Sequence, residues 1–139
     1  MINPDSSRTQ LIPVPAFSDN YIWLLCKGGH AVVVDPGASE PIEKLLGQYH
    51  LTLDAILLTH HHPDHVGGVK ALKALTNAKV YGPLGETLPV CDEGLKEDDN
   101  ITLENLGLTL SILDIPGHTA GHIAYFGYLD TGKPVVFCG

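Results

Sequence analysis

The chain has 139 residues, of which 44% are hydrophobic and 17% are charged, so we expect one domain with a packed core rather than a disordered chain. No stretch approaches the ~20 apolar residues that a transmembrane helix needs, and the first residues form no apolar signal segment. We therefore expect a cytoplasmic protein without a membrane partner. The formal net charge of -8, with no cluster of Lys or Arg, argues against a nucleic-acid partner.

The cysteine and aromatic residues are few and point to packing roles. Cys26, Cys91 and Cys138 stand far apart and form no CxxC sequence. Because the count is odd and the spacing is wide, we expect buried reduced thiols rather than a disulfide framework or a zinc ribbon. We assign Tyr21 and Trp23 to the core.

Three short apolar runs follow a polar segment, residues 1–10, that we expect to be loose. They lie at residues 11–14, 21–26 and 31–34 and are rich in Val, Ile, Leu and aromatic residues, which is typical of strands. Turn-forming Ser-Asp-Asn and Gly-Gly sequences separate them. This pattern predicts three adjacent strands that run antiparallel.

Two helices are predicted next, with short strands between and after them. Residues 39–49 combine a proline at a first helical position with apolar residues at i, i+3, i+4 and i+7. Residues 55–58 form a brief apolar run that indicates a buried strand, and residues 79–81 indicate another. The second helix lies between these strands, and its apolar stripe consists of Val66, Val69, Leu72 and Leu75.

The second half of the chain is dominated by predicted strands. Residues 82–100 are acidic and marked by Gly and Pro, and we assign them only to the surface. Residues 101–103, 108–115, 123–128 and 134–138 are predicted strands. Alternating strands and helices, followed mostly by strands, predict an α/β (α+β) fold with helices on the outer face of a mixed sheet.

The sequence Thr-His-His-His-Pro-Asp-His at residues 59–65 follows the apolar strand directly and is the first candidate metal site. Imidazole and carboxylate groups are the usual ligands of Zn²⁺ and similar metals. In an extended segment His60 and His62 point to the same side. The proline then bends the chain, so that Asp64 and His65 leave in another direction. Two such pairs can serve two metals ~3.5–4 Å apart; an adventitious metal patch or a tag-like run is the alternative.

A second candidate element, Pro-Gly-His-Thr-Ala-Gly-His at residues 116–122, follows another predicted strand. We expect His118 to be the third ligand of the metal held by His60 and His62, since three imidazoles and a water form a working catalytic zinc shell. His122 is either a further ligand or, as we prefer, a structural histidine hydrogen-bonded beneath the site.

The remaining histidines and motifs add no second chemistry. We expect His61 to face away from the metal, and His30 and His50 to be ordinary surface residues. The chain contains no GxSxG nucleophile sequence and no glycine-rich phosphate loop.

These elements resemble those of a known superfamily. Residues 59–65 fit the TH-x-H-x-D-H motif of the metallo-β-lactamase superfamily, and residues 116–122 resemble its next histidine element. Within that superfamily the chain most resembles glyoxalase II, the hydroxyacylglutathione hydrolases. The sequences that carry this closer resemblance are PAFSDNYIW (residues 15–23), VDPG (34–37), THHHPDHVGG (59–68) and PGHTAGHI (116–123).

The resemblance implies a fold, a metal centre and ligands. The fold would be the N-terminal half of an αββα sandwich, with a domain over residues 11–139 that is incomplete at its C-terminus. His60, His62 and His118 would hold the first metal, and Asp64 and His65 part of the second. Zinc is the expected metal, two per complete site, with iron or manganese as substitutes. The family's bridging aspartate and later histidine are absent, so this chain is expected to hold one metal well.

The resemblance also implies an activity for the complete protein. It would hydrolyse a glutathione thioester, S-D-lactoylglutathione, to D-lactate and glutathione by a metal-bound hydroxide that Asp64, the catalytic residue, orients. This reaction belongs to methylglyoxal detoxification. The alternatives are another enzyme of the fold, such as a lactonase, β-lactamase or persulfide dioxygenase, and a catalytically silent truncated metal-binding domain.

Overall fold

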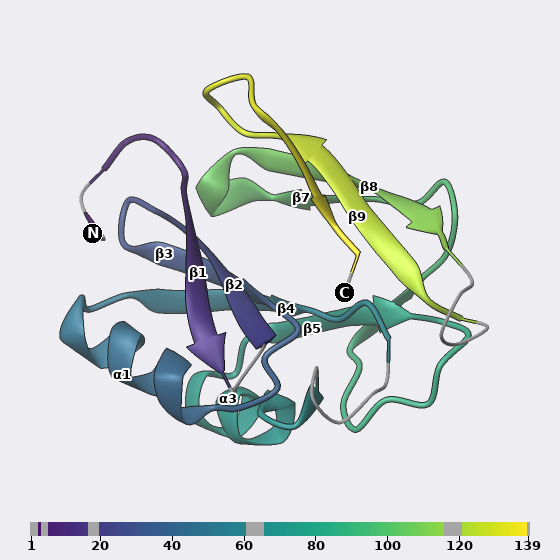
Figure 1. Cartoon of the computed structure of the whole chain (residues 1–139), viewed down its shortest axis with the longest axis horizontal. Helices are drawn as coiled ribbons and strands as arrows, with labels where there is room; N and C mark the ends of the chain where they lie inside the picture. Colours follow the sequence, from purple (N-terminus) through teal and green to yellow (C-terminus); the bar gives the residue numbers. More distant parts are fainter. Residues whose placement is uncertain (1–2, 4–5, 17–19, 61–65, 116–120, 139) are drawn as a thin grey trace.

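Two β-sheets face each other, and the α-helices that the structure describes cover the outer face of the first sheet (Figure 1). The computed structural model describes residues 3, 6–16, 20–60, 66–115 and 121–138. The first sheet consists, in spatial order, of β1 (Gln10–Ala16), β2 (Asn20–Lys27), β3 (His30–Val34), β4 (Thr52–Leu57), β5 (Lys79–Pro83) and β6 (Glu93–Leu95). The second sheet consists, in spatial order, of β10 (Pro134–Phe137), β9 (Ile123–Tyr128), β8 (Leu108–Asp114) and β7 (Asn100–Leu103). The helices whose residues the structure describes in full are α1 (Glu40–Gln48), α3 (Val69–Thr76) and the 3₁₀ helix η1 (Glu104–Leu106).

The first sheet is mixed, as the sequence predicts. Strands β1, β2 and β3 pair antiparallel, which confirms the three adjacent strands expected near the start. From β3 onward the pairs are parallel, and α1 and α3 make the crossovers to β4 and β5. Parallel neighbours end at the same edge of a sheet, so the residues that follow β3 and β4 emerge side by side.

Helix α1 agrees closely with its sequence pattern. Ser39 is its N-cap residue and Pro41 lies in its first turn, where a missing N–H costs no hydrogen bond. Ile42 and Leu46 are buried against the first sheet. The periodicity of this segment therefore identified the face that packs.

Helix α3 is shorter than the expected stripe. It begins at Val69 and ends at Thr76, and only Val69 and Leu72 are buried within it. Val66 is buried but lies outside this helix, whereas Leu75 is 61% exposed. The prediction that Leu75 belongs to the packed stripe is wrong, because the last turn of this short helix presents it to solvent.

The first sheet packs on both of its faces. Along β3, Ala31 and Val33 belong to the core beneath the helices, while Val32 and Val34 belong to the core between the sheets. A strand buried on both faces must be continuously apolar, which explains the run of residues 31–34. The second sheet supplies the other half of the inter-sheet core with Leu110, among others.

The cysteines follow the expectation only in part. Cys26 is buried, and burial raises the pKa of its thiol. Cys91 and Cys138 are exposed, so the prediction that all three thiols are buried is wrong for these two. None of the three forms a disulfide.

The two aromatic residues of β2 are also more exposed than expected. Tyr21 is 56% and Trp23 36% exposed, so the assignment of both to the core is wrong. Strand alternation places them on the same face as Leu25, which is buried between the sheets. The second sheet covers Leu25 and leaves the two residues nearer the start of β2 at its margin.

Two of the described residues within 1–10 are held by the rest of the fold, and the looseness expected of the segment as a whole stays a prediction. Gln10 belongs to β1. Thr9 is buried, and its N–H donates to the carboxylate of Asp130 at 3.0 Å. The domain boundary at residue 11 stays a prediction. None of the helices in the described part of the chain has the length and apolar character that crossing a bilayer requires.

A tight backbone contact joins the turn after β3 to the start of α3. The N–H of Gly68 donates to the carbonyl of Pro36 at 2.8 Å. A Cβ at Gly68 would lie 2.5 Å from the carbonyl carbon of Ala38 and 2.6 Å from the nitrogen of Ser39. Only glycine permits this approach, so the Gly-Gly sequence fixes the segment that precedes α3 against the turn.

Replacing Gly68 should therefore destabilise the protein. We expect Gly68→Ala to lower the free energy of unfolding by about 1–3 kcal/mol, because backbone atoms must move to admit the methyl group. Gly47 is the matched control: it lies in α1 with open space around it, and Gly47→Ala should raise the free energy by ~0.5–1 kcal/mol. Urea unfolding of the three proteins measures both, and an unchanged Gly68→Ala protein would contradict the contact.

Candidate metal centre

The end of β4 leads into a buried segment that carries the first predicted ligand. Leu58, Thr59 and His60 are all buried, with His60 only 2% exposed. The predicted ligands His62, Asp64 and His65, and also His61, lie outside the described residues, as does His118. Within the described part of the chain no three His, Cys, Asp or Glu side chains form a group that could hold a metal ion. The convergence of three imidazoles on one cation thus stays a prediction.

A buried hydrogen-bond chain runs from Asp35 through Thr59 to His60. The backbone N–H of Thr59 donates to Oδ1 of Asp35 at 2.9 Å, and its hydroxyl bonds to Oδ2 at 2.7 Å. The same hydroxyl oxygen lies 2.7 Å from Nδ1 of His60. Asp35, Thr59 and His60 are 5%, 0% and 2% exposed, so these hydrogen bonds are shielded from water.

Asp35 was not among the expected site residues. It belongs to the VDPG sequence (residues 34–37), which contributed only to the family resemblance. The signal that would have found it is topological: Asp35 follows β3, Thr59 follows β4, and these two strands are parallel neighbours. The N–H of Asp35 donates to the carbonyl of Leu57 at 2.9 Å, which brings the two strand ends together.

His122 lies beside His60 and not at the surface. It is 5% exposed, and its ring stacks on the ring of His60 with a centroid separation of 4.4 Å. Its Nε2 lies 2.7 Å from the carbonyl oxygen of Cys138, and because a carbonyl can only accept, this nitrogen carries the proton. The burial and the hydrogen bond that we preferred for His122 are confirmed.

The second sheet holds the same segment from the opposite side. The N–H of Ile123 donates to the carbonyl of Thr59 at 3.0 Å, and the hydroxyl of Tyr125 donates to the carbonyl of Leu58 at 2.7 Å. Burial, and then the charge of Asp35, raise the pKa of Tyr125 well above its ordinary value. Strand β9 thereby fixes the backbone that presents His60.

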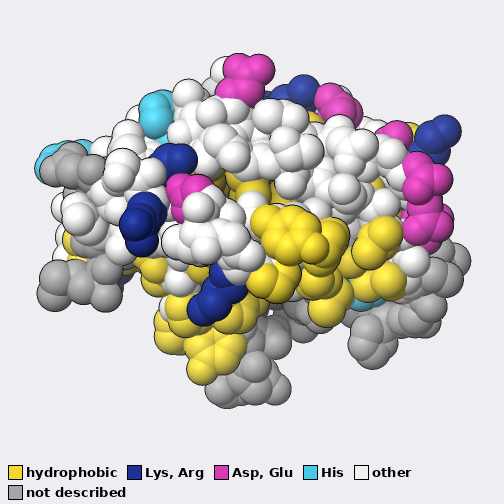
Figure 2. Space-filling view, turned by 90° about the horizontal axis from the view of Figure 1, so that it is seen from above, with side chains coloured by type: hydrophobic (Ala, Val, Ile, Leu, Met, Phe, Trp, Pro, Cys, Tyr) yellow, Lys and Arg dark blue, Asp and Glu magenta, His cyan; other side chains and the backbone are white. Residues whose placement is uncertain are grey.

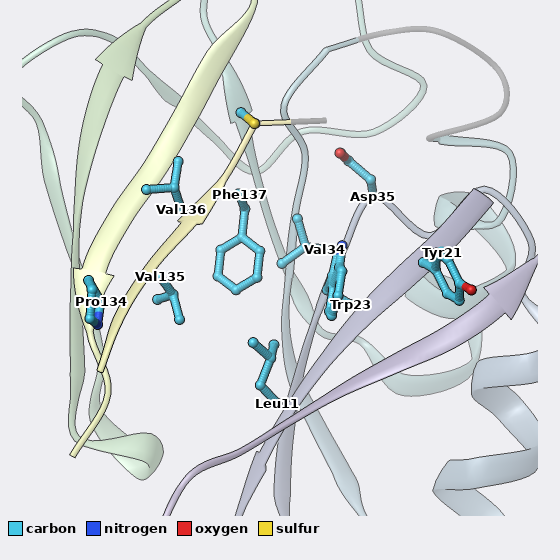
Figure 3. A pocket seen from close by; sticks show the side chains of 10 residues that line it. Leu11, Tyr21, Trp23, Val34, Asp35, Pro134, Val135, Val136 and Phe137 are labelled. Atoms are coloured by element: carbon cyan, nitrogen blue, oxygen red, sulfur yellow. The ribbon is translucent and has the colours of Figure 1, made fainter. Parts of the chain in front are cut away.

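An apolar groove of about 320 Å³ opens between β2 and β10, close to Asp35 (Figure 3). Tyr21 and Trp23 line one side, and Val136 lies on the other. Hydrophobic side chains also gather in a continuous patch on the face shown in Figure 2. The groove borders the hydrogen-bond chain, so a molecule bound there would lie next to the candidate centre.

Two other histidines lie away from the candidate centre. His50 is exposed, as expected. His30, at the start of β3, is half-buried, and its Nδ1 lies 3.0 Å from the carboxylate of Asp54. This pair lies at the opposite end of β3 and β4 from Asp35 and Thr59.

The chain matches a family model described as "Metallo-beta-lactamase superfamily" over residues 16–139. It is 52% identical over 130 residues to a protein named hydroxyacylglutathione hydrolase from Albidiferax ferrireducens, covering 94% of this chain and 50% of that one. A protein of the same name from Cupriavidus metallidurans is 48% identical over 134 residues, covering 91% and 50%. This chain thus spans about half the length of these curated relatives.

Solved structures share the fold. The B3 metallo-beta-lactamase BLEG-1 superimposes with a TM-score of 0.79 at 27% identity, covering 94% of this chain and 71% of that one. ETHE1 from Myxococcus xanthus superimposes with a TM-score of 0.71 at 26% identity, covering 86% and 53%. The fold class expected from the sequence is therefore confirmed.

The raised pKa of Tyr125 predicts how stability depends on pH. Below pH 10 both states are protonated and its contribution is fully present; above pH 10 the unfolded chain releases the proton while the folded chain retains it, so stability falls as pH rises. We expect wild-type stability to fall faster above pH 10 than that of Tyr125→Phe, by up to about 1.4 kcal/mol per pH unit.

Denaturant unfolding between pH 8 and pH 11 measures this difference. Tyr128→Phe, which removes a hydroxyl from an exposed ring, controls for the loss of a tyrosine. Parallel pH profiles for wild type and Tyr125→Phe would contradict the assigned role of burial.

Proposed function

The chain belongs to the metallo-β-lactamase superfamily, and on that premise we propose that it carries the metal-binding part of a hydroxyacylglutathione hydrolase. In the complete protein this enzyme hydrolyses a glutathione thioester, S-D-lactoylglutathione, to D-lactate and glutathione. The proposal is supported by relatives of that name at 48–52% identity. The structural observation that carries the proposal is the buried series of hydrogen bonds from Asp35 through Thr59 to Nδ1 of His60.

The donor chemistry of the described residues fits a metal ion. A histidine that binds a metal through one ring nitrogen almost always engages the other in a hydrogen bond. His60 has this arrangement, because Nδ1 contacts Thr59 and Nε2 is the remaining nitrogen. A pair of buried imidazoles, stacked at the end of a strand, also resembles a site more than a hydrophobic core.

We assign the ligands from the sequence motifs. His60, His62 and His118 hold the first cation, and Asp64 and His65 contribute to a second. Zinc is the proposed metal, with iron or manganese as substitutes. When bound, a divalent cation of this kind lowers the pKa of water toward ~7 and polarises a carbonyl group.

The protein's own residues position the reactants. Asp64 orients the attacking water, Thr59 and His122 fix the ring of His60, and β9 fixes the backbone behind it. The glutathione thiolate is a good leaving group, so the site needs no strong general acid. We further propose a cytoplasmic location, a role in methylglyoxal detoxification and no nucleic-acid or membrane partner, in line with the acidic composition.

The fold also serves other activities, which the test must separate. BLEG-1 is named a B3 metallo-beta-lactamase, but its identity of 27% is about half that of the curated relatives. Lactonase, β-lactamase and persulfide dioxygenase activities and a silent metal-binding domain are therefore outcomes to exclude.

The test measures metal content and substrate preference together. The full-length protein that contains this sequence should bind zinc and hydrolyse S-D-lactoylglutathione in preference to nitrocefin or a lactone, and it should consume no O₂ with glutathione persulfide. His60→Gln should weaken zinc binding and lower hydrolysis by about 100-fold or more. Removing a metal ligand costs more affinity and activity than removing the group that hydrogen-bonds to that ligand. His50→Gln is the matched control, because this histidine is exposed.

Two results would contradict the proposal. Preference for another substrate would assign the site to a different reaction of the fold. Bound metal without turnover of any of the four substrates would indicate a silent metal-binding domain.

A further inference from the structure

We propose that Asp35 and Thr59 set the tautomer of His60 and so act as positioning residues of the metal centre. The inference rests on the metal-binding part of the proposed function. It concerns how the protein prepares a ligand before any metal arrives, and it assigns roles to two residues outside the expected ligand set.

The carboxylate of Asp35 fixes the direction of the first hydrogen bond. Both of its oxygens are engaged by Thr59, Oδ1 by the backbone N–H and Oδ2 by the hydroxyl. An ionised carboxylate only accepts hydrogen bonds, so the hydroxyl of Thr59 must donate its single proton to Oδ2. At 2.7 Å this is a short charge-assisted bond.

The direction of the second bond follows from the first. The hydroxyl of Thr59 already donates its only proton to Asp35, so its oxygen can only accept a hydrogen bond from His60. At 2.7 Å from this oxygen, Nδ1 of His60 must therefore carry a proton. The reverse arrangement would bring two lone pairs to within 2.7 Å in a buried place, where low dielectric makes an unmade hydrogen bond costly.

The consequence for His60 is that its lone pair lies on Nε2. A neutral imidazole binds a metal through the nitrogen without a proton, and the partner of the other nitrogen decides which one that is. The hydrogen bonds from Asp35 through Thr59 thus select the tautomer of His60 that binds a metal through Nε2. No proton has to move within the ring when a metal binds.

The surroundings keep this arrangement rigid. His122 stacks on the ring of His60 and directs its own Nε2 proton to Cys138, so it does not compete for Thr59. Asp35 adopts a left-handed backbone conformation with φ of 50°, a conformation that is uncommon for residues other than glycine but more frequent for Asp. The fold accepts this conformation where the ends of β3 and β4 meet.

The first test reads the tautomer directly in the metal-free wild-type chain. ¹⁵N NMR of the histidine side chains distinguishes a proton on Nδ1 from one on Nε2, and the spectrum of His60→Gln assigns the signal. We expect His60 to be protonated on Nδ1. A proton on Nε2, or an even mixture of tautomers, would overturn the proposal, and a folded variant is needed only for the assignment of the signal.

The second test measures zinc affinity by competition with a chelator. Thr59→Val keeps the shape and removes the hydroxyl, and we expect zinc to bind about 10–100-fold more weakly. Thr59→Ser restores the hydroxyl and should bind nearly as tightly as wild type. Asp35→Asn should also weaken binding, because its amide can accept from only one of the two Thr59 donors while its own NH₂ meets the other.

The control replaces a carboxylate near the start of β4, whereas Thr59 follows the end of that strand. Asp54 contacts His30 and the side-chain amide of Asn105. Asp54→Asn should leave zinc affinity unchanged. A folded Thr59→Val protein that binds zinc as tightly as wild type would overturn the positioning role.

The two proposals fail in different ways. If wild type and His60→Gln bind zinc equally, His60 is no ligand and the metal centre itself is wrong. If His60→Gln loses zinc while Thr59→Val and Asp35→Asn retain it, the metal centre stands and only the positioning role is wrong.

Discussion

The buried carboxylate of Asp35 is the constraint on which the candidate centre depends. It lies where two parallel strands end together, and it engages both hydrogen-bonding groups of Thr59, the residue before His60. A buried charge of this kind is tolerated only when its oxygens are hydrogen-bonded. The same bonds that satisfy the carboxylate therefore fix the backbone and the hydroxyl that orient the imidazole. Stability and preparation of the ligand come from one set of contacts.

The two sheets cooperate in presenting this segment. The first sheet delivers residues 58–60 from β4, and the second sheet holds their carbonyl groups through Ile123 and Tyr125. The inter-sheet core behind them is apolar and closely packed, so the segment has little freedom to shift. The groove between β2 and β10 leaves the surface beside Asp35 open.

Much of this architecture could be predicted from the sequence, for identifiable reasons. Strand alternation and helical periodicity found the sheets and α1, because burial on one face or both leaves a strong apolar pattern. Burial at the ends of the elements was harder to predict. Leu75 and Trp23 continue an apolar pattern, but no neighbouring element in the described part of the chain fully covers them. The role of Asp35 depends on a contact with Thr59, 24 positions away, which local patterns do not contain. The ligand roles of His60, His62 and His118 remain predictions from the sequence.

The central claim is that the imidazoles of His60, His62 and His118 surround one cation. X-ray absorption spectroscopy of the chain loaded with one equivalent of zinc tests it most directly, because the outer-shell scattering counts imidazole rings. We predict three imidazole nitrogens at about 2.0–2.1 Å, and one fewer ring in His118→Ala. A shell with a single imidazole, or one dominated by the sulfur of an exposed cysteine, would contradict the account.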